Sequence, residues 1–324
     1  MKPGPAYRAG SRPFPASRPS AKSPKDIICK ISGLPAQKSY PPVGNRCIMR
    51  AVMPHRKVLS FRRFKTMENK VLLILIDGLR PDALGQCQHP FLYSFMKDSS
   101  AHTFHGQSVM PSITLPCHMS LFHSVTPDRH GTLNNTYVPP THKLDGLFDI
   151  LERQKKKCAF FYTWAQLRDL CRPGALAREE FCNYYKYDAA ADCEMCGRTI
   201  RSLKEEKPDF VFYYTGNTDE VAHKYGWMSP QYMDAIALAS QNVEKIIAEL
   251  PEEYSVVITA DHGGHARTHG LDIPEDMTIP ISFYGPQWEA GKELESVGLL
   301  NLAPTIAAML GCEVSEDWDG VSLL

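Results

Sequence analysis

The sequence predicts an α/β protein built on a mostly parallel central sheet. Two short apolar runs, residues 71–76 and 255–260, have the composition of strands that are buried on both faces of a parallel sheet. Each run ends directly in an aspartate, Asp77 or Asp261. Strand-like and helix-like segments alternate along the rest of the chain, which indicates a single domain over residues 67–324.

Further elements follow in chain order between and after these two runs. Pro116 suits the first turn of a helix, Ser229 and Pro230 form an N-cap and first-turn pair, and Gly311 suits the position after a helix C-terminus. The stretch to about residue 207 has a mixed pattern with a helix near its end. The other expected helices are 91–96, 116–125, 143–154, 229–250 and 299–310, and the further strands are 102–110, 158–162, 210–214 and 278–284.

Residues 1–66 differ in kind from the rest of the chain. They contain 15 Lys and Arg, a single acid, Asp26, and ten prolines, whereas the remaining residues contain 21 Lys and Arg against 35 acids. We expect this basic, Pro-rich leader to be disordered. Three interpretations stay open: a tail for an acidic partner, an organelle transit peptide, or a start codon assigned too far upstream. We favour the last, because Met67 opens the run MENKVLLILIDG.

No stretch approaches the ~20 apolar residues of a membrane span, and no secretory signal with an apolar region is visible. The expectation is therefore a cytoplasmic protein that acts without a membrane or nucleic acid; its oligomeric state is unknown from sequence. The ten cysteines lack a disulfide framework, so reduced thiols are expected. Cys193 and Cys196 have CxxC spacing, but without a second pair they are interpreted as helix thiols rather than a zinc or redox site.

The exit of the strand at 255–260 concentrates groups that bind metals. Asp261 and His262 follow the strand, paired glycines come next, and His265 and His269 follow closely. Open α/β sheets bind ligands at the carboxyl ends of their strands, and glycines let the backbone approach a ligand there. Histidines combined with carboxylates suit zinc-like metals. The alternative is a buried Asp–His pair with solvated histidines beyond it.

Three other segments of the chain also contain side chains that could bind a metal or act beside one. Asp77 ends the first strand, where its alternative role is that of a helix cap or turn residue. Thr114 stands at the start of a helix, either as an N-cap or as a nucleophile supported by the helix N-terminus and a metal. Asp219 and His223 are four residues apart just after the strand at 210–214, so one helical turn places both on one face.

Together these groups make three carboxylates, three imidazoles and one hydroxyl. Six such ligands are too many for one tetrahedral ion and suit two ions. Two cations ~3.5–4 Å apart hold the attacking and leaving oxygens of a displacement at phosphorus. The set comprises Asp77, Thr114, Asp219, His223, Asp261, His262 and His269.

The motifs that contain this set resemble the alkaline phosphatase superfamily and, within it, the type I phosphodiesterase and nucleotide pyrophosphatase branch. They are LILIDGLRPDAL, MPSITLPCHMSLFHSVTPDRHG, TDEVAHKYG, TADHGGHARTHG and LLNLAPTIAAMLG, and in the family's order they cover nearly all of residues 70–324. The resemblance implies an alkaline-phosphatase-like three-layer α/β/α fold. It also implies two divalent metal ions, zinc first, with manganese or magnesium as alternatives.

The resemblance divides the ligands between the two metals. Asp77, Asp261 and His262 resemble the ligands of one ion, beside Thr114, which resembles the family's nucleophile. The ligands of the other ion are then Asp219, His223 and His269.

One asparagine and three histidines near the motifs complete the predicted site. Asn135 stands where this branch places an asparagine that holds a phosphoryl oxygen, and Asn134 is the fallback. His118, His130 and His265 are expected to support ligands or loops, with substrate contact as an alternative for His265.

The function that the resemblance implies is hydrolysis of a small phosphorylated substrate, a phosphate diester or nucleotide pyrophosphate, through a phosphothreonine on Thr114. A phosphomonoesterase is the alternative, because a monoester carries one more negative charge and needs a cation such as Arg80, Arg129 or Arg267 near the metals. A metal-bearing binding protein is a third hypothesis, although such a protein needs no nucleophile.

Sulfatases and cofactor-independent phosphoglycerate mutases are less favoured alternatives, and the substrate-selecting caps of longer relatives are reduced in this sequence. The Cys-x-Pro-x-Arg motif of sulfatases is absent, and cofactor-independent phosphoglycerate mutases use a serine nucleophile and a large second domain. The large caps that select substrates in longer relatives are missing or reduced to a small cap-like region at about 137–207. The substrate therefore stays open.

Overall fold

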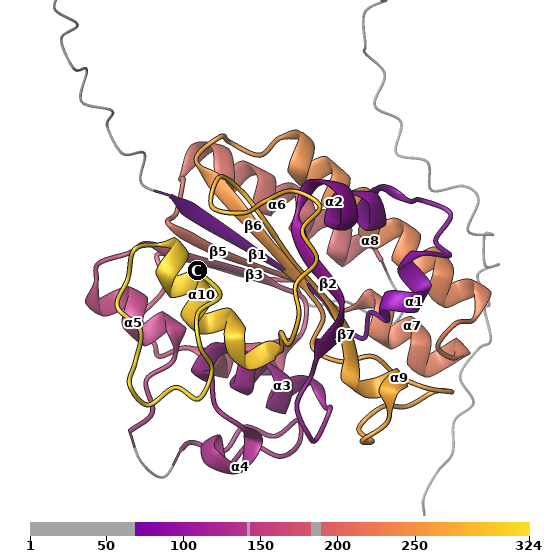
Figure 1. The fold of residues 1–324 in the computed structure, drawn as a ribbon, viewed down its shortest axis with the longest axis horizontal. Helices are drawn as coiled ribbons and strands as arrows, with labels where there is room; N and C mark the ends of the chain where they lie inside the picture. The colour runs from indigo at the N-terminus through magenta and orange to yellow at the C-terminus, as the bar shows by residue number, and fades with distance from the viewer. Residues whose placement is uncertain (1–68, 141–142, 183–188) are drawn as a thin grey trace, which may run out of the picture. The chain divides into compact units, whose positions relative to one another are not determined.

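A seven-stranded sheet in the order β2-β7-β6-β1-β5-β3-β4 forms the centre of the computed structural model, which describes residues 69–140, 143–182 and 189–324 (Figure 1). Strands β6, β1, β5, β3 and β4 are parallel, while β7 runs antiparallel to both β6 and β2. The predicted mostly parallel sheet is confirmed. The strands are β1 (Lys70–Ile76), β2 (Ala101–Gln107), β3 (Cys158–Tyr162), β4 (Arg178–Phe181), β5 (Phe210–Thr215), β6 (Tyr254–Thr259) and β7 (Thr278–Tyr284).

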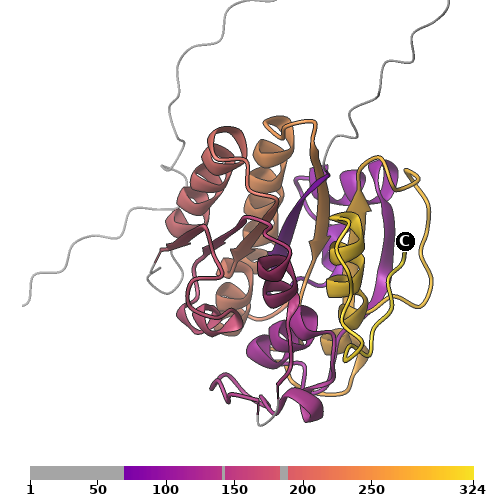
Figure 2. The same ribbon diagram turned by 90° about the vertical axis from the view of Figure 1, so that its left-hand side faces the viewer.

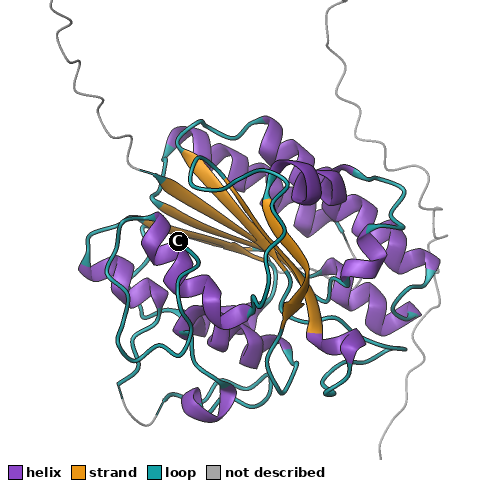
Figure 3. Ribbon diagram, viewed as in Figure 1, coloured by secondary structure: helices purple, strands orange, loops and turns teal. Residues whose placement is uncertain are grey.

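Helices cover both faces of this sheet, which gives the expected three-layer α/β/α fold (Figures 2 and 3). On one face α8 packs against α1, α2, α6 and α7, and on the other α3 packs against α5 and α10. The α-helices are α1 (Pro81–Leu84), α2 (Phe91–Ser99), α3 (Thr114–His123), α4 (Pro127–His130), α5 (Leu147–Arg153), α6 (Ala190–Glu205), α7 (Asn217–Tyr225), α8 (Pro230–Ala248), α9 (Pro274–Met277) and α10 (Leu302–Met309), and the 3₁₀ helices are η2 (Ala165–Leu170) and η3 (Leu299–Asn301).

The three central strands are buried along their whole length, apart from the half-buried Lys70 at the start of β1. Helices on both faces remove β-branched and aromatic side chains from water, as expected for a parallel sheet. The strands end in register, because Ile76 lies opposite Thr215 and Leu75 lies opposite Thr259. The residues that follow β1, β5 and β6 therefore emerge side by side from a rigid support.

Two helix ends follow the signals in the sequence, and one differs. The Ser229 side chain accepts a hydrogen bond from the Tyr232 amide at 3.2 Å at the start of α8. Gly311 follows α10 with a φ of 66°, as a C-terminal glycine does. Helix α3 begins at Thr114, and Ile113 occupies its N-cap position without a capping side chain. The alternative role of Thr114 as an N-cap is therefore wrong.

The segment 137–207 contributes to the sheet as well as to the surroundings of the site. It supplies β3 and β4, which pair in parallel with each other and with β5, together with α5 and α6. Strand β4 was not predicted, because its residues REEF are half-buried or exposed and lack an apolar pattern. The small cap-like region stays a prediction.

The predictions for the leader, for membrane spans and for the cysteines can be compared with the structure only within the described residues. The leader at 1–66 lies outside the described residues. Within the described ranges, no helix combines the length and the apolar character that crossing a membrane requires. All cysteines in these ranges are free thiols; Cys193 is exposed and Cys196 is buried on α6.

Candidate metal centre

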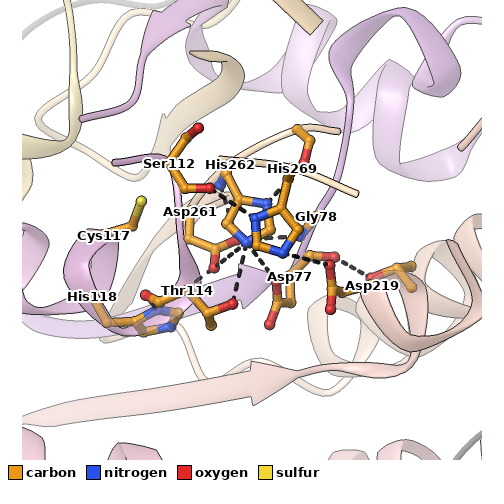
Figure 4. A network of polar contacts seen from close by, with 12 residues as sticks. Asp77, Gly78, Ser112, Thr114, Cys117, His118, Asp219, Asp261, His262 and His269 are labelled. Atoms are coloured by element: carbon orange, nitrogen blue, oxygen red, sulfur yellow. Dashed lines mark hydrogen bonds and ion pairs between the residues drawn. The ribbon is translucent and has the colours of Figure 1, made fainter. Parts of the chain in front are cut away.

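The predicted ligands meet where β1, β5 and β6 end (Figure 4). Asp77 follows β1, Asp261 and His262 lie just beyond β6, and Asp219 is in the first turn of α7, which begins two residues after β5. Thr114, the first residue of α3, points into the same space. Segments 184 residues apart in the sequence therefore supply one site.

Asp219, His223 and His269 form the first group of potential metal ligands, with ligand atoms within 4.8 Å of one another. Asp219 Oδ2 lies 3.3 Å from His223 Nε2, and Asp219 Oδ1 lies 3.8 Å from His269 Nε2. The spacing of four residues on α7 places Asp219 and His223 on one face, as predicted. This is the same trio that the sequence assigned to one metal.

The second group consists of Asp77, Asp219 and His262. His262 Nε2 lies 3.4 Å from Asp77 Oδ1 and also 3.4 Å from Asp261 Oδ2. The structure thus brings Asp261 next to this group and adds Asp219, which is shared with the first. Thr114 Oγ1 lies 3.2 Å from His262 Nε2, so the predicted nucleophile adjoins the second group.

Within the candidate site, three buried carboxylate oxygens have no hydrogen-bond partner among the described residues: Asp77 Oδ1, Asp219 Oδ1 and Asp261 Oδ2. Burial and then the charges of Asp261 and Asp219 hold the pKa of Asp77 well above its usual range. Burial raises the pKa of Asp261 as well. Unpaired buried carboxylates are costly, and cations remove that cost. The residues therefore fit divalent metal ions.

The three histidines are oriented for metal binding through their Nε2 atoms. In each ring Nδ1 is hydrogen-bonded to a backbone carbonyl: His262 to Gly263 at 2.8 Å, His269 to Ser112 at 2.8 Å and His223 to Arg267 at 3.0 Å. Such a carbonyl fixes the ring and keeps a proton on Nδ1, so Nε2 is the nitrogen that can face a cation.

The histidines differ in their protonation. Burial lowers the pKa of His262, and it lowers the pKa of His269 to about 4, so both are neutral near pH 7. The hydrogen bond to Asp219 raises the pKa of His223 to about 9. Burial raises the pKa of Asp219, but His223 and the neighbouring histidines outweigh it and leave that pKa lowered. His223 and Asp219 thus form an ion pair at pH 7.

Two glycines are required where the backbone folds around these ligands. Gly78 has a φ of 67° and donates its amide to Asp261 Oδ1 at 3.2 Å. A Cβ at Gly264 would lie 2.1 Å from the Trp227 ring. The paired-glycine signal after Asp261 therefore reflects a close approach of the chain to neighbouring elements as well as a turn.

A small cavity of about 120 Å³ opens beside the ligands. Asn135 lines it, and its Oδ1 accepts a hydrogen bond from the Leu115 amide at 3.0 Å. Asn134 instead accepts from the Thr136 amide at an exposed position. Of the two asparagines, Asn135 is the one that lines the described cavity, and its role stays a prediction. The lining consists of Asp77, Thr114, Asn135, Trp164, Tyr214, Asp219, Glu220, His223 and His269.

Sequence reasoning missed Trp164, Tyr214 and Glu220 at this cavity. The Tyr214 hydroxyl donates a short hydrogen bond to Asp77 Oδ2. Tyr214 is the last residue of the predicted strand, and Glu220 directly follows the predicted ligand Asp219. Their positions in the sequence could therefore have indicated that both lie at the site. Trp164 lies in the mixed-pattern stretch, where no sequence signal relates it to the motifs.

None of the described residues that line the cavity is Lys or Arg. The guanidinium of Arg80 is hydrogen-bonded to Asp82 and to the Gly264 carbonyl, and Arg80 lines a different cavity. Arg129 pairs with Asp319, and Arg267 is exposed. The three arginines considered for a monoester site do not line this cavity.

The remaining histidines have separate environments. His265 Nδ1 lies 2.7 Å from Asp276 Oδ1, and Ser120 contacts His130 Nε2 at 3.1 Å. The first bond joins the loop after β6 to α9, and the second joins α3 to α4; the supporting roles of these histidines stay a prediction. His118 is buried behind Thr114 and bonds its carbonyl through Nδ1 at 2.8 Å.

Residues 71–273 match the sequence profile of the family described as type I phosphodiesterase / nucleotide pyrophosphatase. The match covers more than half of the chain and includes every predicted ligand. The chain belongs to this family. Its membership confirms the resemblance on which the assignments were made.

Among curated relatives, human ectonucleotide pyrophosphatase/phosphodiesterase family member 7 is 25% identical over 225 residues, which cover 60% of this chain and 48% of that protein. The 2,3-bisphosphoglycerate-independent phosphoglycerate mutase of Clostridioides difficile (strain 630) is 27% identical over 142 residues, 40% of this chain and 27% of the mutase. The chain therefore spans about half, or less, of the length of these curated relatives.

Comparison with solved structures shows that this chain has an alkaline-phosphatase-like fold. Murine ectonucleotide pyrophosphatase / phosphodiesterase 5, an inactive threonine-to-alanine variant in complex with AMP, has a TM-score of 0.65 at 14% identity, covering 76% of this chain and 96% of the murine one. A 2-O glycosaminoglycan sulfatase, BT1596, has a TM-score of 0.64 at 15% identity, covering 79% and 73%. At these identities the likeness concerns the fold alone.

Proposed function

We propose that this chain is a two-metal hydrolase that cleaves phosphate diesters or nucleotide pyrophosphate bonds through a phosphothreonine on Thr114. Family membership supports a phosphodiesterase-type hydrolase. The observation that carries the proposal is the set of unpartnered buried oxygens on Asp77, Asp219 and Asp261 beside the Thr114 hydroxyl. A binding protein would have no use for that hydroxyl at the edge of the ligand set.

Two divalent cations would be held by the carboxylates and Nε2 atoms of the two groups, with zinc as the first choice for this nitrogen and oxygen donor set. When bound, they supply Lewis acidity that favours the ionised Thr114 hydroxyl and offsets charge on phosphoryl and leaving oxygens.

The chain's own residues then have defined tasks. Thr114 Oγ1 attacks phosphorus, the bond from phosphorus to the leaving oxygen breaks, and water later cleaves the phosphothreonine. The first turn of α3, which begins at Thr114, directs its positive end toward the phosphoryl group. The Leu115 amide holds Asn135 Oδ1, which leaves the Nδ2 end of that amide to donate to a phosphoryl oxygen.

The cavity lining favours a diester over a monoester. A monoester dianion needs cationic side chains, and the described lining has none, while Glu220 adds a negative charge. Trp164 and Tyr214 supply aromatic surface of the kind that accommodates a base or another organic substituent. The named murine relative in complex with AMP and inactivated by replacement of a threonine supports a nucleotide substrate and a threonine nucleophile.

The test compares initial rates of zinc-loaded protein on bis(p-nitrophenyl) phosphate and on p-nitrophenyl phosphate, with a chelator control. We expect faster turnover of the diester, abolished by chelation and restored by zinc. A preference for the monoester would replace the proposal with the phosphomonoesterase alternative. Turnover of neither compound by protein shown to hold two metals would contradict both.

A further inference from the structure

A fourth buried aspartate, Asp192, lies outside the metal centre. It is in the first turn of α6 and is only 4% exposed. In contrast to Asp77, Asp219 and Asp261, both of its carboxylate oxygens accept hydrogen bonds. A satisfied carboxylate has no need of a cation, so Asp192 requires an explanation other than metal binding.

The hydrogen bonds to Asp192 come from two separate strand exits. The Thr163 hydroxyl, directly after β3, donates to Oδ1 at 3.4 Å. The hydroxyl of Thr215, the last residue of β5, donates a short hydrogen bond to Oδ2. The amide of Asn217, the first residue of α7, also donates to Oδ2, at 3.2 Å. One carboxylate thus joins α6 to the ends of two adjacent strands.

This arrangement is costly for the folded state. Burial raises the pKa of Asp192 to about 6, although the hydrogen bonds from Thr215 and Asn217 oppose that rise. The titratable groups that face it, Tyr213 on β5 and Cys196 on α6, are uncharged near that pH and offer no compensating cation. The carboxylate is therefore held by the hydrogen bonds from Thr163, Thr215 and Asn217 and not by an opposite charge.

We propose that Asp192 is a positioning residue of the metal centre, whose carboxylate fixes the start of α7 and thereby the places of Asp219 and His223. Asn217 is two residues before Asp219 in the same helix, so movement of this first turn carries the shared ligand with it. The proposal rests on the function proposed above. This role differs from that of the carbonyl groups that orient the histidine rings directly, because Asp192 acts on the ligands through the backbone of α7.

The same carboxylate also reaches the cavity wall. Thr163 immediately precedes Trp164, which lines the cavity together with Asp219 and His223 of α7. Asp192 therefore sets the separation between the wall and the helix that bears two metal ligands. Loss of the carboxylate should loosen both sides of the site together, while the core packing of α6 stays as it is.

The first test is the zinc affinity of Asp192→Asn, measured by competition with a chromophoric chelator on protein whose fold is verified by circular dichroism. We expect affinity for one zinc equivalent to fall by about ten- to a hundredfold, as for other groups that orient metal ligands. The matched control is Thr199→Val. Thr199 is buried in the same helix, but its hydroxyl bonds to the Met195 carbonyl at 2.8 Å, so zinc affinity should be unchanged.

A second variant keeps the carboxylate and removes one donor. Thr215→Val should weaken zinc binding in the same direction, and the double variant should lose less than the sum of the two single losses, because both act on one contact. If Asp192→Asn does not fold, Thr215→Val decides the matter. Wild-type zinc affinity in both single variants would overturn the proposal. Failure of the wild-type chain itself to bind zinc would instead overturn the metal centre, and this inference with it.

Discussion

The two halves of the metal centre differ in their access to solvent. In the closed half, the side chains of Asp77, Asp261 and His262 are at most 3% exposed. In the open half, His223 is 39% exposed and pairs with Asp219. Both halves border the cavity, but the closed half adjoins Thr114, the proposed nucleophile, whereas the open half contains the more exposed ligand. We therefore expect the closed half to serve the chemistry and the open half to influence the choice of substrate.

The halves also differ in how they compensate their own charge. In the open half His223 and Asp219 neutralise each other without a cation, because that pairing raises the pKa of His223 to about 9. In the closed half burial lowers the pKa of His262 and raises the pKa of Asp77, so neither compensates the other. The closed half is therefore the part that we expect to depend on bound cations.

The largest effect is expected in the closed half at the nucleophile. Thr114→Ala should reduce diester turnover by at least about 10³-fold, because no other hydroxyl lines the described cavity except that of Tyr214, which donates to Asp77. Zinc binding should change little. Initial rates and zinc stoichiometry on the same preparation check this. Ser120→Ala, on the same helix but bonded to His130, is the control, and retained activity in Thr114→Ala would remove Thr114 from the mechanism.

Histidine variants in the two halves should respond differently to zinc. His223→Ala should lower activity about ten- to a hundredfold at limiting zinc and recover most of it in excess zinc, because solvent can supply the missing ligand at an exposed position. His262→Ala should lose as much or more and recover little, since its site is fully enclosed. Zinc titrations of activity distinguish them, and equal recovery would mean that burial does not separate the halves.

Without metal, the closed half should be a source of instability. Asp77→Asn should raise the free energy of unfolding of chelator-treated protein by about 1–3 kcal/mol at pH 7.5, a few degrees in Tm. The folded-state pKa of Asp77 is raised, so its ionised form opposes folding above the unfolded value near 4, and the opposition grows with pH.

Calorimetry at two pH values checks the sign of this effect. The gain should be present at pH 7.5 and vanish only at about pH 3, below the unfolded-state pKa, where the carboxyl is protonated in both states. His223→Gln should show no such gain, because it breaks a compensated pair. A lower Tm for Asp77→Asn at pH 7.5 would mean that the closed half is stable without cations.

Much of the fold could be predicted from local patterns. The apolar runs that became β1 and β6 are buried on both faces, so their composition alone marks them as central strands. The edge strand β4 could not be predicted, because Arg178, Glu179 and Glu180 form ion pairs or hydrogen bonds at the surface and carry no apolar period. Prediction succeeds where burial dictates composition and fails where it does not.

The candidate site shows the same division. Residues that end a central strand, such as Asp77 and Asp261, could be predicted because strand ends in a parallel sheet meet at one edge. Trp164 and Asp192 could not, since their relation to the site depends on how β3 and α6 pack beside β5. A single aspartate in the first turn of a helix looks in sequence like any favourable helix start.

The smallest expected effect is in the open half, where Glu220 should influence whether a monoester or a diester is preferred. This half-buried carboxylate lines the cavity next to Asp219 and repels a dianionic monoester more than a monoanionic diester. Glu220→Gln should therefore raise the monoester-to-diester ratio of kcat/KM by about three- to tenfold, with the diester rate nearly unchanged. Parallel rates on the two p-nitrophenyl compounds give the ratio.

The control for this last prediction removes one negative charge elsewhere. Glu275→Gln does so at a residue that lines a separate cavity, and it should leave the ratio as it is. The effect of Glu220→Gln should shrink as salt rises from 0.05 to about 0.5 M, because screening weakens repulsion at a partly exposed position. An unchanged ratio would mean that the open half does not select by charge, and discrimination would then have to come from the closed half, where we propose that the phosphoryl group binds.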